Sequence, residues 1–198
     1  RSRRLGKGGA GMSGLSLVEG AGFPGEDLTG EYRFSMFRTL ADTSPQTVTL
    51  ADLRLLLSEG MCADLVDRIR AEPDKARRSE LKRGLPCVSV SGEFAGGHKA
   101  EHLVRHSGLL CVDFDAAENP NLAGSAGEWR DRLAKDESVM LAFVSASGNG
   151  VAAVCRIEPE RHAEAFDALR EHFRIHHGLE ADRSCRDVSR LRFLSHDP

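Results

Sequence analysis

The second half of the chain has the more regular pattern of hydrophobic and polar positions. Apolar runs bounded by turn residues predict four strands, at 109–114, 139–145, 151–157 and 190–195. Apolar side chains at helical spacing predict helices at 127–135 and 159–177, the second closed by Gly178. The resulting order, β-α-β-β-α-β, is the split βαβ arrangement of RRM-like and ferredoxin-like domains. We therefore expect an α+β fold whose core is formed by residues 109–198.

Residues 31–108 show shorter and more mixed patterns. A strand is expected around Phe34–Phe37, and Thr49 followed by Asp52 predicts a capping box at the start of a helix. The pattern also predicts a helix that Pro73 ends, a charged helix at 75–82 and a strand at 87–90. We interpret this region as a helical-plus-strand N-terminal subdomain.

Composition indicates a soluble globular protein: apolar residues make up 40% of the chain, charged residues 29%, and no apolar run approaches the ~18 residues that span a bilayer. The net charge of -3 gives no global basic field, so nucleic acid would be bound by local basic patches. Five widely spaced cysteines without a CxxC pair fit a reducing cytoplasm and argue against a cysteine zinc site.

The two ends of the chain have different patterns. Residues 1–30 are rich in Gly, Ser and Arg without periodicity, which is typical of a flexible leader or a cloning remnant. The sequence stops directly after an apolar run at Pro198, so we expect it to be a piece of a longer protein.

The strongest chemical signal is a pair of aspartates at the end of the 109–114 strand. Asp113 and Asp115 are two residues apart, so both carboxylates project from one face while Phe114 packs on the other. Two carboxylates this close repel each other unless cations hold them, and a pair of hard divalent ions does so in polymerases. The alternative is that one aspartate caps the following loop and the other is solvated.

Topology predicts which residues join this pair. In the usual antiparallel sheet, ordered 4-1-3-2, the end of strand 1, the turn between strands 2 and 3 and the start of strand 4 meet at one edge. This would bring Asp187, which on its own would be interpreted as a turn residue, to the pair as a third catalytic and metal-binding carboxylate. Arg190, at the start of the last strand, is either a surface charge or a fork for triphosphate oxygens, and the neighbouring carboxylates favour the second. The predicted nucleotide-binding residues are Ser145, Ser147, Gly148, Asn149, Ser189 and Arg190.

The segment at 145–150 has two compatible interpretations. Its glycines permit positive φ and a close approach of backbone N–H groups to phosphate. Asn-Gly between two β-rich runs is also the commonest signal of a short hairpin. We keep both, since a hairpin turn can also contact phosphate.

Two weaker patterns involve basic side chains. Lys82, Arg83 and Lys99 are candidates for a nucleic-acid path, with a solvated face as the alternative. His98, His102 and His106 recur every four residues, which on a helix would align them for a metal ion. The run is short and lacks a second ligand cluster, which disfavours a zinc site.

Seven short motifs occur in order from about residue 31 to the end: Ser35–Arg38, the helix at 47–57, Ser91–Phe94, His106–Leu109, Val112–Asp115, Ser145–Gly150 and Asp187–Phe193. Together they resemble the BT4734-like/VirE N-terminal domains. These are primase-polymerase-like modules of the archaeo-eukaryotic primase superfamily, often found ahead of a helicase in plasmids, phages and integrated elements. The resemblance implies template-directed nucleotide addition with two Mg or Mn ions, a DNA template or primer, NTP or dNTP, and a helicase domain in the same polypeptide or in trans.

The resemblance also assigns roles to residues. Asp113 and Asp115 would form the first motif and Asp187 the third. The second motif of the superfamily is usually Ser-x-His, whereas this sequence has serines at 145 and 147, so triphosphate binding would rest on Arg190, Ser147 and backbone amides. The alternative is a non-catalytic nucleic-acid-binding or scaffolding module on the same fold. A replication-initiator nuclease is disfavoured, because it needs a His-x-His strand and a nucleophilic tyrosine.

Overall fold

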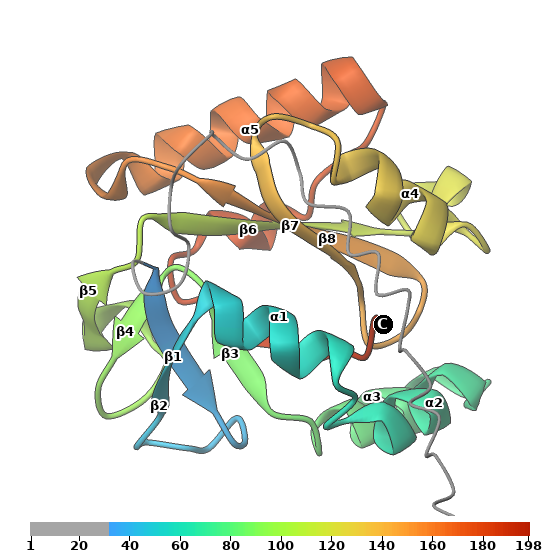
Figure 1. The fold of residues 1–198 in the computed structure, drawn as a ribbon, viewed down its shortest axis with the longest axis horizontal. Coiled ribbons are helices and arrows are strands. Elements are labelled where there is room, and N and C mark those ends of the chain that lie inside the picture. Colours follow the sequence, from blue (N-terminus) through green and yellow to red (C-terminus); the bar gives the residue numbers. More distant parts are fainter. Residues whose placement is uncertain (1–31) are drawn as a thin grey trace, which may run out of the picture.

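The computed structural model describes residues 32–198 and shows an α+β fold with antiparallel sheets (Figure 1). The predicted leader at 1–30 lies outside the described residues. In the described part, no helix has both the length and the apolar character needed to cross a membrane. All five cysteines are free thiols.

A three-stranded antiparallel sheet forms the centre of the molecule. Its strands are ordered β6-β8-β7, with bounds Leu109–Asp115 (β6), Gly150–Arg156 (β8) and Val139–Val144 (β7). Two helices, α4 (Ala126–Leu133) and α5 (His162–His177), cover one face, as Figure 1 shows. Phe114, Phe166 and Phe173 are buried between this face and the helices. The strands and helices predicted for 109–178 are confirmed, including the left-handed Gly178 (φ 66°) that ends α5.

A second sheet packs near the other face of the first. Its order is β2-β1-β3-β9, with bounds Gln46–Thr49 (β2), Arg33–Phe37 (β1), Cys87–Ser89 (β3) and Arg192–Phe193 (β9). Helix α1 (Leu50–Ser58) lies between the sheets, where Leu53 and Leu57 pack with Cys111 and Val154. A core on each face of the central sheet therefore holds it in place, because both faces exclude water.

The start of α1 is the capping box that the sequence predicts. The Thr49 hydroxyl accepts from the backbone N–H of Asp52 (3.1 Å), and the Asp52 carboxylate accepts from the backbone N–H of Thr49 (2.8 Å). The helix motif at 47–57 begins too early, because residues 47–49 belong to β2. Helices α2 (Ala63–Ala71) and α3 (Lys75–Lys82) confirm the next two predictions. The hairpin of β4 (Gly92–Phe94) and β5 (Leu103–His106) was not predicted.

The predicted place of the last strand is wrong. Instead of pairing with β6 in a 4-1-3-2 sheet, β9 pairs with β3, through Cys87↔Phe193 and Val88↔Arg192. The segment after α5 passes beside β6, where the backbone N–H of Asp182 donates to the carbonyl of Asp113 (2.9 Å). Phe193 packs in a small core with Cys87, which explains why the apolar end of the chain joins the second sheet.

Two histidines meet where β5 approaches the start of α5. Nε2 of His106 and Nδ1 of His162 lie 3.0 Å apart. Burial lowers the pKa of His162 to about 4, helped by the neighbouring His106 and opposed by Asp187. Burial also lowers the pKa of His106. The native protein therefore keeps this pair neutral at pH values where an exposed histidine takes up a proton.

We expect the free energy of unfolding to fall as the pH drops from about 6.5 to 4. In this window the unfolded chain protonates His162 and the native state does not, which costs on the order of 1–3 kcal/mol. Urea titrations at several pH values measure the loss, and His162→Leu should reduce it. His176→Leu, an exposed histidine on the same helix, is the control and should retain the wild-type slope. Equal slopes in all three proteins would contradict the prediction.

Candidate active site

A cleft of about 510 Å³ brings distant segments of the chain together. Residues from β6, from the β7–β8 turn, from the stretch before and in β9 and from the end of α3 line it. The polar side chains of the lining are Lys82, His98, Asp113, Asp115, Ser145, Ser147, Asp187, Ser189, Arg190 and Arg192. Most residues predicted to act together therefore share one cleft, even though β9 does not pair with β6.

Asp113 and Asp115 project from the same face of β6. Phe114 between them packs on the opposite face, 5.0 Å from the ring of Phe173. In the register with β8, Asp113 lies opposite Ala152 and Asp115 opposite Gly150. Small residues on the neighbouring strand leave space above the sheet, so both carboxylates can face the cleft.

Gly150 is required by this close approach. A Cβ atom at position 150 would lie 2.6 Å from the carbonyl oxygen of Phe114 and 3.1 Å from Oδ1 of Asp115. The first contact is with backbone, which cannot rotate away. The absence of a side chain here thus sets the position of the Asp115 carboxylate.

Gly150→Ala is expected to lower the free energy of unfolding by about 1–3 kcal/mol, because overpacking against backbone forces the strands apart. Chemical denaturation followed by circular dichroism measures the change. Gly127→Ala is the matched control: a Cβ there meets nothing within 4 Å, and alanine favours a helix. A loss of stability as large in Gly127→Ala as in Gly150→Ala would contradict the argument.

A buried arginine holds Asp113. Nη1 of Arg192 lies 2.9 Å from Oδ2 of Asp113, and the Arg192 side chain is only 7% exposed. Its other terminal nitrogen donates to Sγ of Cys185 (2.7 Å), while its Nε is buried without a partner. Arg192 was not predicted to belong to the site. The available signal was a charged residue between apolar Leu191 and Phe193 in a short strand.

The electrostatics of this pair follow from its burial. Burial raises the pKa of Asp113, and Arg192 and then Arg190 counteract this shift only in part. Burial opposes the charge of Arg192, but Asp113 raises the Arg192 pKa above its ordinary value. The guanidinium therefore remains charged, and Asp113 is the carboxylate that compensates it.

Asp187, the third predicted carboxylate, also lines the cleft, but its contacts are with Ser189 and not with Arg192. Oδ1 of Asp187 accepts from the backbone N–H and the hydroxyl of Ser189, both at 2.9 Å. Among residues 32–198, Asp113 forms a candidate ligand group with Asp182 and Cys185, whose ligand atoms all lie within 4.8 Å of one another. This group includes neither Asp115 nor Asp187. Asp182 was not predicted, and it also pairs with Arg190 (2.9 Å).

The β7–β8 connection is a hairpin, as expected, but its turn lies at Ser145–Gly148 and not at Asn149-Gly150, because Gly150 is already the first residue of β8. The backbone N–H of Ser145 donates to the carbonyl of Gly150 (2.8 Å), and Gly148 adopts φ 74°. The Ser145 and Ser147 hydroxyls lie 3.2 Å apart and line the cleft, whereas Gly148 and Asn149 are not in the lining. Arg70 of α2 donates a hydrogen bond to the carbonyl of Ser145 in this turn (3.4 Å). The turn is thus fixed by its own backbone and by α2.

A family comparison adds to this geometry. The family described as BT4734-like, N-terminal domain, matches residues 80–198, more than half of the chain. The chain belongs to the BT4734-like N-terminal domain family. The match includes every polar side chain that lines the cleft, while the motifs expected before residue 80 lie outside it. Comparisons with curated proteins and with solved structures find no match.

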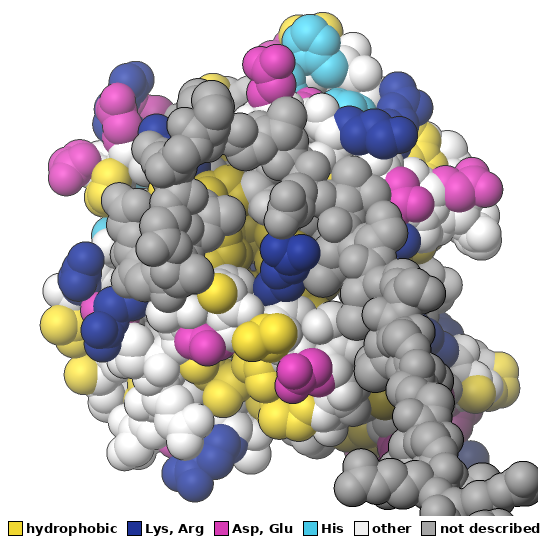
Figure 2. All heavy atoms as spheres, in the orientation of Figure 1, with side chains coloured by type: hydrophobic (Ala, Val, Ile, Leu, Met, Phe, Trp, Pro, Cys, Tyr) yellow, Lys and Arg dark blue, Asp and Glu magenta, His cyan; other side chains and the backbone are white. Residues whose placement is uncertain are grey.

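Of the basic residues predicted to contact nucleic acid, one lies in the cleft of the BT4734-like domain. Burial lowers the pKa of Lys82, while Asp115 and Asp113 oppose the shift, so its ammonium group is within electrostatic reach of both carboxylates. Arg83 follows at the end of α3, and Lys99 pairs with exposed Glu101 at 3.9 Å. On the part of the face in Figure 2 that the grey residues leave uncovered, basic and acidic side chains are interspersed.

The helical alignment of three histidines is wrong for this BT4734-like domain. His98 lies in a bend, His102 in a 3-10 turn and His106 in β5. Only His98 lines the cleft, where its ring contacts Phe37 edge-on at 5.8 Å. Residues 103–106 pair with β4 as a strand, so no continuous helix runs through the three histidines.

Proposed function

We propose that this BT4734-like domain catalyses metal-dependent, template-directed nucleotidyl transfer as a primase-polymerase module of the archaeo-eukaryotic primase superfamily. The observation that carries the proposal is the cleft that unites Asp113, Asp115 and Asp187 with Lys82 and Arg190. Carboxylates beside phosphate-binding cations are the groups that nucleotidyl transfer needs. The β6-β8-β7 sheet with α4 and α5 supplies three strands and both helices of the proposed split βαβ core.

The donor set fits hard divalent cations. Asp113 and Asp115 face the same cleft from one strand, and Mg or Mn ions prefer carboxylate oxygens. A pair of such ions supplies activation of the attacking hydroxyl and neutralises charge on the leaving pyrophosphate. In the proposed site, Asp113 and Asp115 hold the ions, and Asp187 contributes from the facing segment.

The cations and hydroxyls of the cleft fit a triphosphate. Arg190 is 42% exposed and its partner Asp182 is half-buried, so replacing this ion pair by one with phosphate oxygens costs little free energy. Ser147 and Ser145 offer hydroxyl donors on a rigid turn, in place of the Ser-x-His of the superfamily. Lys82 adds a positive charge near the carboxylates. We propose that these groups orient NTP or dNTP for primer synthesis or DNA extension in a mobile element, with DNA and a helicase domain as partners.

A non-catalytic nucleic-acid-binding or scaffolding module is the second candidate. The ion pair of Asp113 with Arg192 favours it, because a buried guanidinium already neutralises one of the carboxylates. Such a module would not bind nucleic acid by stacking bases on the central strand, because β8 (GVAAVCR) carries no aromatic side chain. Such a module would bind DNA without requiring a metal ion.

Incorporation of labelled nucleotides on a primed DNA template, with Mn²⁺ or Mg²⁺, tests the proposal. The first candidate predicts extension that EDTA, Asp113→Ala and Asp115→Asn abolish, and Asp115→Asn leaves the buried Asp113–Arg192 pair intact, so its loss of activity is not a loss of folding. Fluorescence anisotropy on the same samples reports DNA binding separately. DNA binding that EDTA leaves unchanged, with no nucleotide incorporation, would support the second candidate. Equal incorporation by wild type and Asp113→Ala would exclude the first candidate.

A further inference from the structure

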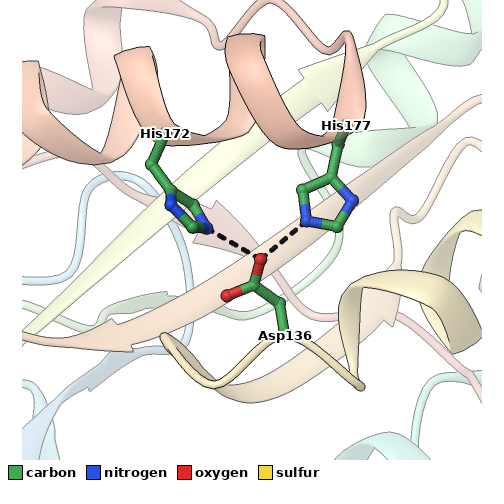
Figure 3. A group of neighbouring side chains, drawn as sticks. All are labelled: Asp136, His172 and His177. Carbon is green, nitrogen blue, oxygen red and sulfur yellow. Dashed lines mark hydrogen bonds and ion pairs between the residues drawn. The ribbon is translucent and has the colours of Figure 1, made fainter.

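A group of side chains with the chemistry to hold a metal ion lies on the opposite side of the central sheet from the cleft. Asp136 lies in the turn between α4 and β7, while His172 and His177 come from the last two turns of α5. Figure 3 shows both imidazoles pointing from the helix toward the Asp136 carboxylate. The ligand atoms of the three residues all lie within 4.8 Å of one another.

Both imidazoles meet one carboxylate oxygen. Nε2 of His172 lies 2.8 Å and Nε2 of His177 lies 2.6 Å from Oδ2 of Asp136. The other oxygen, Oδ1, accepts from the backbone N–H (2.9 Å) and the hydroxyl (2.7 Å) of Ser138. Ser138 therefore fixes the orientation of the Asp136 carboxylate through Oδ1, and Oδ2 faces the two imidazole rings.

The surroundings of the three side chains resemble those of a metal centre more than those of a surface ion pair. Asp136 and His177 have side chains only 8% and 10% exposed, whereas His172 is 34% exposed and gives access from solvent. Phe173 lies against both rings, at 5.3 Å from His172 and 5.8 Å from His177. Nδ1 of His177 is buried without a partner, so that ring makes its polar contact only through Nε2.

The distances also suit a metal ion. Zinc–ligand bonds of about 2.0–2.1 Å in tetrahedral geometry place neighbouring ligand atoms ~3.3 Å apart. The two Nε2–Oδ2 distances, 2.8 and 2.6 Å, are shorter than this by about 0.5 and 0.7 Å, so an outward movement of the rings by that amount would open the site. Two imidazoles and one carboxylate are a ligand set typical of zinc and other transition metals.

We propose that Asp136, His172 and His177 bind a transition-metal ion of the zinc type. The ion joins the end of α5 to the α4–β7 turn, and water or another ligand completes its coordination on the exposed His172 side. This site is independent of the proposed function, since Phe114, and not Asp113 or Asp115, faces the side of β6 on which α5 packs. Its role is to fasten the long helix to the sheet.

Titration of the metal-free protein with Zn²⁺, in excess Mg²⁺ to occupy the carboxylate cleft, tests the proposal. Calorimetry should give one Zn²⁺ per chain, and saturation should raise Tm by about 5–10 °C. Asp136→Asn and His177→Ala should each weaken binding at least ~100-fold. Bound Co²⁺ should show the visible absorption of a histidine-ligated ion. Circular dichroism of each variant checks that it remains folded.

Two variants serve as controls. His176→Ala removes the exposed neighbour whose ring lies 4.6 Å from that of His172, and His162→Leu removes the other close pair of imidazoles. Both should bind Zn²⁺ as the wild type does. No binding by the wild type, or unchanged binding by His177→Ala, would overturn the proposal. A loss in His176→Ala equal to that in His177→Ala would place the ion on the outer histidine pair and would also overturn it.

Discussion

Asp115→Asn is expected to reduce nucleotide incorporation by at least about 10³-fold while changing the free energy of unfolding by less than about 0.5 kcal/mol. Asparagine has the same shape but removes the negative charge that would hold a divalent ion in the cleft. Asp115 is exposed at the end of β6, so the substitution leaves no buried group unpaired. This separates catalysis from folding more cleanly than any change at Asp113.

The measurement compares initial rates of incorporation over a range of Mn²⁺ concentrations. Asp167→Asn is the matched control: it is an exposed aspartate on α5 that pairs with exposed Arg186, at 3.4 Å, and it should retain wild-type rates. Incorporation by Asp115→Asn at the wild-type rate would exclude Asp115 as a metal ligand. A rate restored by high Mn²⁺ would support a weakened metal site.

The second large change, in the free energy of unfolding, is expected at the ion pair between Asp113 and Arg192 in the wall of the cleft. Asp113→Ala should lower the free energy of unfolding by about 3–5 kcal/mol, because it leaves the charge of Arg192 buried without a carboxylate. Arg192→Leu should cost less, about 1–3 kcal/mol, since Asp113 is 22% exposed and can be hydrated from the cleft. Urea denaturation followed by circular dichroism gives both values.

The control comes from the same segment of the chain. Arg190→Leu breaks the exposed pair with Asp182 and should cost no more than about 1 kcal/mol. The double variant Asp113→Ala/Arg192→Leu should be more stable than Asp113→Ala alone, because it leaves neither charge buried. Equal costs for Arg190→Leu and Arg192→Leu, or a double variant less stable than Asp113→Ala, would contradict a buried, coupled pair.

Much of the local structure was predictable because it depends on neighbouring residues. The capping box at Thr49 and Asp52 and the left-handed Gly178 are decided within one helical turn. The placement of Asp113 and Asp115 on one face follows from the period of a strand. The β4–β5 hairpin was missed because its strands are short, and Gly92 and the glycines before Lys99 weaken any periodic signal.

The sequence by itself determined the helices and strands around the cleft, the shared face of Asp113 and Asp115, and the α+β class, since these follow from side-chain periodicity and local hydrogen bonds. Only the tertiary structure decided that β9 joins the second sheet, that Arg192 holds Asp113, and that Asp136 meets two histidines of α5. These contacts join residues 36 to 106 positions apart (Asp136 to His172, Cys87 to Phe193). Burial of apolar surface by the whole fold selects them, and no local pattern in the sequence reports that burial.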